Sequence, residues 1–329
     1  SSQGRFTEQK GKRIVKNRIS NKINRAEKKR RFMKNFRATK TLYLFVVPGL
    51  VYYVLFKYWP IYGSQIAFRD YSPFLGFTKS PWVGMQNFER FFRSPDFFLI
   101  LKNTLLINVT NLILGFPFPI ILAVLLNQVR NKGFKKLVQT ATYAPYFISV
   151  VVLVGMMYTM LSPYSGVVNA VIRFFGGDPI HFMGKPGMYV MIYVLSGIWQ
   201  TCGWSAIVYI AALASVSPDL HESAIVDGAG RLQRIWHIDL PGIMPTIITM
   251  LILTAGQLLT IGFEKSYLMQ NSMNLGVSEV ISTYTYKRGL VDGDFSYASA
   301  VEMMQSVVNF VILISVNRFS KRFSDTSLW

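Results

Sequence analysis

The sequence is short of cysteine, of acidic residues and of the compact motifs that bind phosphate or metal. Its single cysteine, Cys202, lies within an apolar run, so no disulfide can form inside the chain. It contains no G-x-x-x-x-G-K-S/T phosphate loop, and its three histidines, His181, His221 and His237, form no His-Glu-x-x-His zinc motif. We therefore expect no catalytic residue, no metal site and no cofactor on this chain.

Negative charge is the scarcer kind, since 35 Lys and Arg accompany 16 Asp and Glu and give a net charge of +19. The excess is concentrated in residues 1–41, where fifteen basic residues accompany only Glu8 and Glu27. Apolar residues recur there at helical spacing, at Val15, Ile19, Ile23 and Ala26. Two interpretations stay open: an amphipathic helix on anionic lipid headgroups, or a disordered basic arm that enforces topology. Because aromatic residues do not interleave with the basic ones, we do not expect nucleic-acid binding.

Apolar residues, by contrast, are abundant: 51% of the chain is hydrophobic and the mean hydropathy is +0.31. A bilayer core of ~30 Å needs about 20 apolar residues per spanning helix. We predict six spans at residues 42–59, 98–126, 137–161, 187–214, 242–262 and 296–316. The prolines in the segment that follows the first span exclude a long helix there. The fold class is therefore an all-α integral membrane protein, with a tail at 1–41, a membrane domain at 42–316 and a second tail at 317–329.

Basic residues near the span ends predict the orientation of the chain. With the N-terminus in the cytoplasm, the inner segments hold 24 Lys and Arg and the outer segments hold ten. Six spans then return the C-terminus to the cytoplasm, so both termini are expected on the inner side.

A polar segment at residues 217–241 separates the fourth and fifth spans. Ser217-Pro218-Asp219 is a strong helix start, and Asp227-Gly228 is a stop because glycine tolerates the left-handed turn. We expect one helix over 218–226 and a second from Arg231 to Ile238. Pro241 is expected to end that second helix and to open the next span.

The motifs Glu222-Ser223-Ala224, Asp227-Gly228-Ala229 and Ile238-x-Leu240-Pro241 resemble the EAA loop of ATP-binding-cassette (ABC) importer permeases of the carbohydrate-uptake branch. The resemblance covers roughly residues 40–329 and includes Trp82-Val83-Gly84-x-x-Asn87-Phe88 and Asn103-Thr104-Leu105. It implies a type I ABC importer permease fold in the inner membrane of a prokaryote. It also implies that the loop couples to an ATPase through Glu222, Ser223, Ala224, Asp227, Gly228, Arg231, Ile238, Leu240 and Pro241.

The C-terminal third resembles the LplB-like permeases, through Gly262-Phe263-Glu264-Lys265, Val280-Ile281-Ser282-Thr283-Tyr284 and Ser327-Leu328-Trp329. That branch is associated with complex polysaccharide fragments, including uronate-rich ones such as alginate. The resemblance implies alternating access driven by two separate ATPase subunits, which hold the ATP and Mg. The further partners it implies are a second permease, expected to be a paralogue, an extracytoplasmic solute-binding protein, an oligosaccharide and membrane lipids.

Polar side chains inside the predicted spans are the candidates for a substrate path, because such groups usually face a bundle interior or a cavity. Amides and hydroxyls suit sugar hydroxyls, and aromatic rings suit apolar sugar faces. The candidates are Tyr193, Trp199, Gln200, Trp204, Gln257, Glu264, Glu302, Gln305 and Asn309. For any one of them, hydrogen bonding between helices is the alternative and the one we favour. Glu302 is the exception, since an intramembrane carboxylate is a functional candidate by default.

A second hypothesis is an ion- or proton-coupled secondary transporter in which Glu302 and Glu264 carry charge. Such carriers often contain inverted repeats and helices broken near the membrane midplane. No clear internal repeat is visible in this sequence. An ATPase that purifies tightly with the chain separates the two hypotheses.

Overall fold

The computed structural model describes residues 43–323. The basic tail at 1–41, with the two interpretations given for it, lies outside the described residues. Contacts divide the chain into two units, one up to Gln65 and one from Ile66 onward. The described residues are helical almost throughout, and their only β-type pairing is an isolated bridge between Arg69 and Trp82.

The first helix, Tyr43–Phe68, is longer than the predicted span at 42–59. It passes through a π-helical turn, η1 (Val54–Tyr58), into a 3₁₀ segment, η2 (Trp59–Phe68). The predicted end of this span at residue 59 was therefore too early. Pro60 stands in the first turn of the 3₁₀ segment, a position where its missing N–H is tolerated.

Four further helices of the described residues are long and apolar enough to cross a membrane, and a bent pair completes a sixth span. They lie close to the predicted spans, which confirms the helical membrane fold. Their elements are α4 (Phe97–Thr110), η3 (Asn111–Gly115), α5 (Pro117–Gln128), α9 (Pro186–Ala214), α11 (Arg231–Arg234), η6 (Ile235–Asp239), α12 (Leu240–Ala255) and α16 (Phe295–Phe323).

The third span is broken, so the continuous helix predicted at 137–161 was wrong. α6 (Lys132–Tyr143) continues into a short 3₁₀ turn, η4 (Ala144–Phe147), and α7 (Val150–Met160) then leaves at an angle of 100°. Pro145 lies within the 3₁₀ turn. The Ser149 hydroxyl accepts a hydrogen bond from the Val152 N–H at 3.3 Å and starts the new helix.

The fifth span also ends early, at Ala255 in place of the predicted residue 262. Residues 256–262 are turns and irregular backbone, and α13 (Phe263–Met269) follows. The backbone of this segment is held by side chains of neighbouring spans. The Asn108 amide of α4 donates to the Leu258 carbonyl at 2.7 Å, and the Leu259 N–H donates to Asn309 of α16 at 2.9 Å. Such external partners make irregular backbone tolerable between membrane helices.

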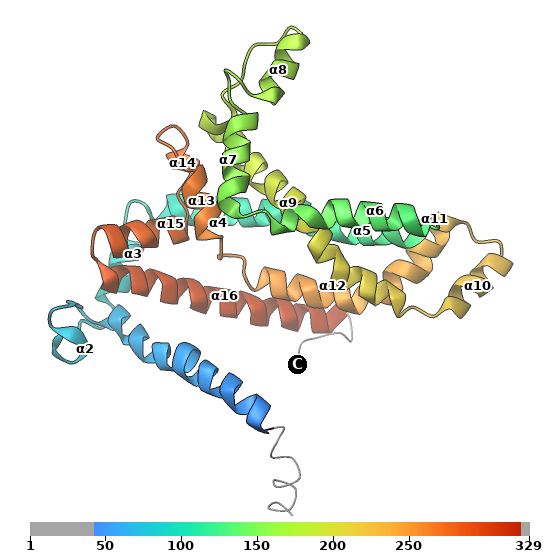
Figure 1. The fold of residues 1–329 in the computed structure, drawn as a ribbon. Coiled ribbons are helices and arrows are strands. Elements are labelled where there is room, and N and C mark those ends of the chain that lie inside the picture. The colour runs from blue at the N-terminus through green and yellow to red at the C-terminus, as the bar shows by residue number, and fades with distance from the viewer. Residues whose placement is uncertain (1–42, 324–329) are drawn as a thin grey trace, which may run out of the picture. The chain divides into compact units, whose positions relative to one another are not determined.

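Short helices connect the spans of the second unit. They are α2 (Gly76–Lys79), α3 (Gln86–Phe92), α8 (Val167–Phe174), η5 (Phe182–Gly184), α10 (Pro218–Val226), α14 (Leu275–Ser278), α15 (Ile281–Tyr286) and η7 (Lys287–Val291). Within that unit, α10 lies at one end of the helices and α3 and α15 lie at the other (Figure 1). The largest helix contact joins α5 and α9. At Gly203 of α9 a side chain would collide with the Thr142 carbonyl of α6, so glycine is required for that close approach.

Candidate functional sites: the coupling loop and the α9 face

The coupling loop, residues 217–241, begins as the sequence predicts. α10 spans Pro218–Val226, and the Ser217 hydroxyl accepts a hydrogen bond from the Asp219 N–H at 3.3 Å. Gly228 has φ of 80°, in the left-handed region that favours glycine. The predicted start and stop of this helix are therefore confirmed.

The second half of the coupling loop differs from the prediction. A single helix runs from Arg231 to Ala255 without ending at Leu240-Pro241. A π-helical turn, η6, directly precedes the proline, and the Leu240 N–H bonds to the Ile235 carbonyl. The wider turn accommodates Pro241 without a break, because π-bulges relieve local backbone constraints inside helices.

Most of the predicted coupling residues are exposed. Glu222, Ser223, Asp227, Gly228, Arg231 and Pro241 are exposed, whereas Ala224, Ile238 and Leu240 are half-buried. The prediction missed the apolar side chains that are exposed beside them. These are Leu220, Ile225, Val226, Leu232 and Trp236, with exposed fractions from 55% to 87%. The sequence did contain a signal for this cluster, because these apolar residues interrupt an otherwise polar segment. A cluster of this kind usually indicates a partner surface.

Asp239 is a second feature of the coupling loop that the prediction missed. Its side chain is fully buried, and the Gln128 amide of α5 donates to its carboxylate at 2.9 Å. The His221 Nε2 atom of α10 lies 3.3 Å from the other carboxylate oxygen. The buried Asp239 carboxylate therefore links α10 to the end of α5, which is the end of the second span that is predicted to face the cytoplasm.

One face of α9 collects several of the predicted path residues. Tyr193, Gly197, Gln200 and Trp204 follow steps of four, three and four residues, so they lie on one side of the helix. The Gln200 amide donates to the Ile148 carbonyl in the break of the third span at 2.8 Å. The Trp204 ring stacks on Tyr146 of the same break, with centroids 4.5 Å apart. This α9 face is therefore packed against irregular backbone.

The same α9 face contacts α13 through a buried lysine. The Lys265 Nζ atom donates to the Tyr193 carbonyl at 2.8 Å and lies 4.5 Å from the centroid of the Tyr193 ring. Lys265 is 8% exposed, and burial lowers the pKa of its ammonium group to about 8. The prediction singled out the neighbouring Glu264, which is exposed, and missed the lysine.

The remaining path candidates do not form one cluster. Asn309 and Gln305 donate to the Thr260 hydroxyl at 2.9 and 3.3 Å, so both brace the irregular end of the fifth span. Gln257 lies beyond the end of α12, although the prediction placed it inside the fifth span. Trp199 and Glu302 are exposed. Their role in a substrate path stays a prediction.

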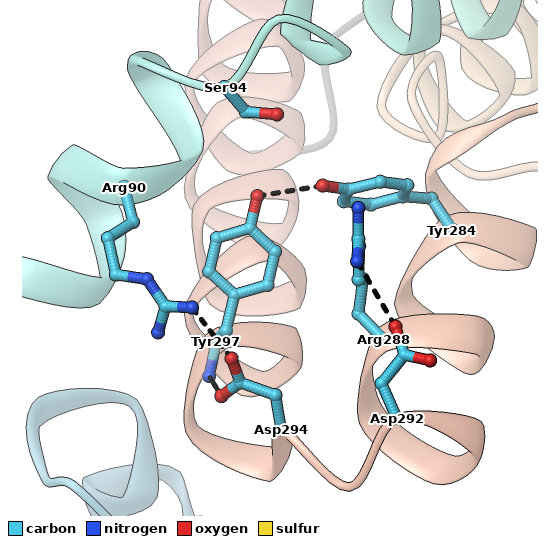
Figure 2. A pocket seen from close by; sticks show the side chains of 7 residues that line it. All are labelled: Arg90, Ser94, Tyr284, Arg288, Asp292, Asp294 and Tyr297. Atoms are coloured by element: carbon cyan, nitrogen blue, oxygen red, sulfur yellow. Dashed lines mark hydrogen bonds and ion pairs between the residues drawn. The ribbon is translucent and has the colours of Figure 1, made fainter.

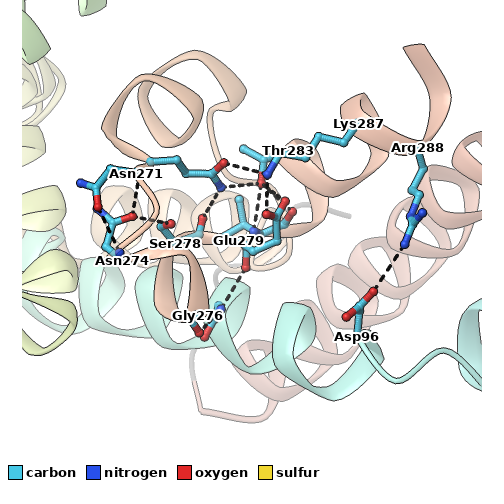
Figure 3. A network of polar contacts seen from close by, with 12 residues as sticks. Asp96, Asn271, Asn274, Gly276, Ser278, Glu279, Thr283, Lys287 and Arg288 are labelled. Carbon is cyan, nitrogen blue, oxygen red and sulfur yellow. Dashed lines mark hydrogen bonds and ion pairs between the residues drawn. The ribbon is translucent and has the colours of Figure 1, made fainter. Parts of the chain in front are cut away.

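A polar network fixes the segment between α13 and α16 (Figure 3). The Asn103 amide of α4 donates to the Gly276 and Glu279 carbonyls at 3.1 and 3.0 Å. The Lys287 ammonium binds the Glu279 carboxylate at 2.6 Å, and the Thr283 hydroxyl donates to the same group at 3.0 Å. We call residues 270–288 together with Asn103 and Thr104 the polar network. Two of the motifs that resemble the family, Asn103-Thr104-Leu105 and Val280-Ile281-Ser282-Thr283-Tyr284, supply side chains to this network.

Beside the polar network lies a cavity of ≈ 360 Å³ lined by paired charges and tyrosines (Figure 2). Arg90 binds Asp294 at 2.8 Å, and Arg288 binds Asp292 at 3.2 Å. The hydroxyls of two tyrosines that line the cavity, Tyr284 and Tyr297, lie 2.9 Å apart. Because each arginine already has a carboxylate partner, this cavity has little unbalanced charge to offer a ligand.

Comparison with known proteins agrees with this architecture. Residues 98–325 match the family described as "binding-protein-dependent transport system inner membrane component". The polygalacturonan/rhamnogalacturonan transport system permease protein YteP of Bacillus subtilis (strain 168) is 44% identical over 93% of this chain and 96% of its own length. Protein LplB of the same organism is 43% identical, over 91% and 94%.

Two solved structures of bacterial ABC transporters are also similar to this chain. A permease chain of a bacterial alginate ABC transporter, crystallised in complex with an alginate pentasaccharide-bound periplasmic protein, superposes with a TM-score of 0.82. That chain is 38% identical, and the match covers 90% of this chain and 99% of the other. A chain of a second structure, of a bacterial ABC transporter involved in the import of the acidic polysaccharide alginate, also superposes with a TM-score of 0.82 and is 39% identical.

Proposed function

This chain belongs to the family of binding-protein-dependent transport system inner membrane components, and on that premise we propose that it imports acidic, uronate-containing oligosaccharides. As a member of that family it is a non-catalytic multi-pass permease subunit of an ABC importer. The observation that supports the acidic cargo is the agreement of two independent relatives. One is a permease for polygalacturonan and rhamnogalacturonan, and the other belongs to an alginate transporter; all of these polymers contain uronate.

We propose that ATP hydrolysis on two partner subunits reaches the spans through the coupling loop. Support comes from the exposed apolar side chains on the loop, which a docked partner would cover. The continuous helix from Arg231 to Ala255 supports the same role, because a displacement of the loop is transmitted directly into the fifth span. A second permease and a solute-binding protein complete the proposed assembly.

The secondary-transporter hypothesis retains one feature in its favour, the broken third and fifth spans. Such breaks also occur in carriers driven by ions or protons. Two observations favour the ABC hypothesis. The family match covers the coupling loop itself. Glu302 is exposed and makes no side-chain bond to any residue between 43 and 323, so no relay partner is visible there.

The ATPase coupling is tested by one strained glycine and one matched control. Gly228→Ala places a side chain at φ of 80°, whereas Gly230→Ala adds one at φ of −69° with ordinary contacts. We expect the native chain and Gly230→Ala to purify with an ATPase and to support its transport-linked activity. Gly228→Ala should lose at least part of both. If no ATPase associates with the native chain, the proposed coupling is wrong.

The cargo is tested by transport into proteoliposomes that contain this chain with its co-purifying subunits and binding protein. Radiolabelled oligogalacturonate and alginate oligosaccharides serve as acidic probes, and maltotriose serves as a neutral one. Uptake of an acidic probe, dependent on ATP and on the binding protein, is the expected result. Uptake of maltotriose alone would exclude the acidic cargo while leaving the ABC assignment intact.

A further inference from the structure

The most unusual charged group in the described residues is Lys265, because it is buried without a carboxylate partner. Among residues 43–323, its Nζ atom donates to the Tyr193 carbonyl at 2.8 Å and lies over the face of the Tyr193 ring. Lys287 offers a direct contrast. Its side chain is 35% exposed, yet it is paired with Glu279 at 2.6 Å. The more deeply buried lysine is therefore the one left unpaired, although burying an uncompensated charge is costly.

The sequence of the surrounding elements explains why no partner is present. α13 packs on α7 and α15, and Lys265 reaches α9. None of these three helices contains an aspartate or a glutamate. The ionisable groups that they do contain are tyrosines and Cys202. The only acid on α13 is the exposed Glu264. The ammonium group therefore lies among aromatic, apolar and backbone groups.

The tip of Lys265 occupies a specific place on the α9 face. It lies 3.3 Å from the position that a Cβ atom would take at Gly197, so the absence of a side chain there makes room for the ammonium group. Gly197 stands between Tyr193 and Gln200 on the face that packs against the broken third span. Irregular backbone between membrane helices usually lines a cavity or is buried in protein, and in transporters it marks substrate sites.

A second unsatisfied group lies on the same face, one turn away. The Tyr189 hydroxyl is buried and has no hydrogen-bond partner among residues 43–323. A buried hydroxyl normally finds a partner, so an unpaired one suggests a ligand that is absent. The Lys265 ammonium and the Tyr189 hydroxyl are both hydrogen-bond donors, and a carboxylate accepts from either kind of group.

From this geometry we infer that Lys265 is the specificity-determining cation of the translocation path, and that it binds a uronate carboxylate of the cargo as the oligosaccharide passes α9. The inference rests on the acidic cargo proposed above. Tyr193 and Gly197 position the ammonium group. A neutral sugar would leave the buried charge uncompensated, so the site discriminates against it.

The test compares Lys265→Gln with the native chain in proteoliposomes that contain the complete transporter. Glutamine keeps a donor for the Tyr193 carbonyl but removes the charge. The probes are trigalacturonate and its fully methyl-esterified form, which share a backbone and differ in charge. We expect uptake of trigalacturonate to fall about tenfold, the loss that one charge-assisted hydrogen bond commonly causes. Uptake of the methyl ester should stay within about twofold of native or rise.

Ser266→Ala is the matched control, because it removes a neighbouring contact between α13 and α9 without changing charge. It should leave the ratio of the two uptake rates unchanged. An equal loss of both probes in Lys265→Gln would show a purely structural lysine and overturn the inference. Unchanged uptake of both would overturn it as well. If the native transporter imports neither trigalacturonate nor an alginate oligosaccharide, the acidic cargo fails and the role of Lys265 fails with it.

Discussion

The coupling loop and the polar network lie at opposite ends of the same unit and are built in opposite ways. In the polar network, asparagine, threonine and charged side chains bond to one another and to backbone carbonyls, and most are buried. In the coupling loop, large apolar side chains are exposed. The network is completed by the chain itself, whereas the loop leaves surface for a partner to cover. Stability should therefore depend on the first region and assembly on the second.

The largest loss of stability is expected when the polar network loses its lysine. Lys287→Met leaves the Glu279 carboxylate, whose side chain is 12% exposed, with the Thr283 hydroxyl as its remaining side-chain partner. We expect the free energy of unfolding to fall by about 2–3 kcal/mol, somewhat less than for a fully buried pair. Thermal unfolding of the purified chain in detergent measures this change.

The matched control for that change is the exposed ion pair between Arg93 and Glu89, whose side chains are 82% and 63% exposed. Arg93→Met should change stability by less than about 1 kcal/mol. The double variant Glu279→Gln/Lys287→Met should recover part of the loss, because no uncompensated charge remains. Equal effects of Lys287→Met and Arg93→Met would contradict the contrast between the two regions.

A smaller loss is expected at the irregular end of the fifth span. Asn309→Ala removes the acceptor of the Leu259 N–H and a donor to Thr260. A buried backbone donor left without a partner costs about 1–3 kcal/mol, and we expect a value near the lower end because the Asn309 side chain that is removed is only half-buried. Ser315→Ala on the same helix removes only a bond to Val311 within α16 and should have little effect. Thermal unfolding again separates the two variants.

A third effect depends on pH. Burial lowers the pKa of Lys265 to about 8, whereas an unfolded lysine titrates near 10.4. Between these values the unfolded chain binds more protons than the folded one, so the stability cost of this buried lysine is full below pH 8 and shrinks as pH rises toward the unfolded pKa. From pH 8 to 9 we expect native stability to gain about 1 kcal/mol relative to Lys265→Gln. Parallel curves for the two proteins would contradict a buried, titrating ammonium group.

The elements that could be predicted are those whose cause is local in sequence. The cap at Ser217, the stop at Gly228 and the fourth span at 187–214 are all encoded by adjacent residues, and each was confirmed within about one residue. The family resemblance rested on the same kind of local pattern and was also confirmed.

The elements that could not be predicted depend on partners distant in the chain. The third and fifth spans continue as apolar runs in the sequence, whereas bonds from the distant Asn108, Gln200 and Asn309 support their irregular backbone. Proline alone is no guide, because Pro145 lies at a break while Pro245 lies inside α12. Lys265 was missed for the same reason. Its isolation appears only when α7, α9 and α15 are seen to contain no acid.

The smallest change in stability is expected on the coupling loop, whose apolar side chains are exposed. Leu232 is 72% exposed and lies between Arg231 and the π-helical turn. Leu232→Ser should alter unfolding by no more than about 0.5 kcal/mol, because it removes no buried contact. It should nevertheless weaken the association of the ATPase subunit, since the serine no longer buries apolar surface against it.

Phe174→Ser supplies the matched control, because Phe174 is 83% exposed on α8, at a distance from the coupling loop in the chain and in space (Figure 1). Both variants should unfold like the native chain, but only Leu232→Ser should release the ATPase at lower salt or detergent concentration in a pull-down. If Leu232→Ser unfolded early, the loop would be part of the folded core. If both variants retained the ATPase equally, the exposed apolar side chains of the loop would not be its contact surface.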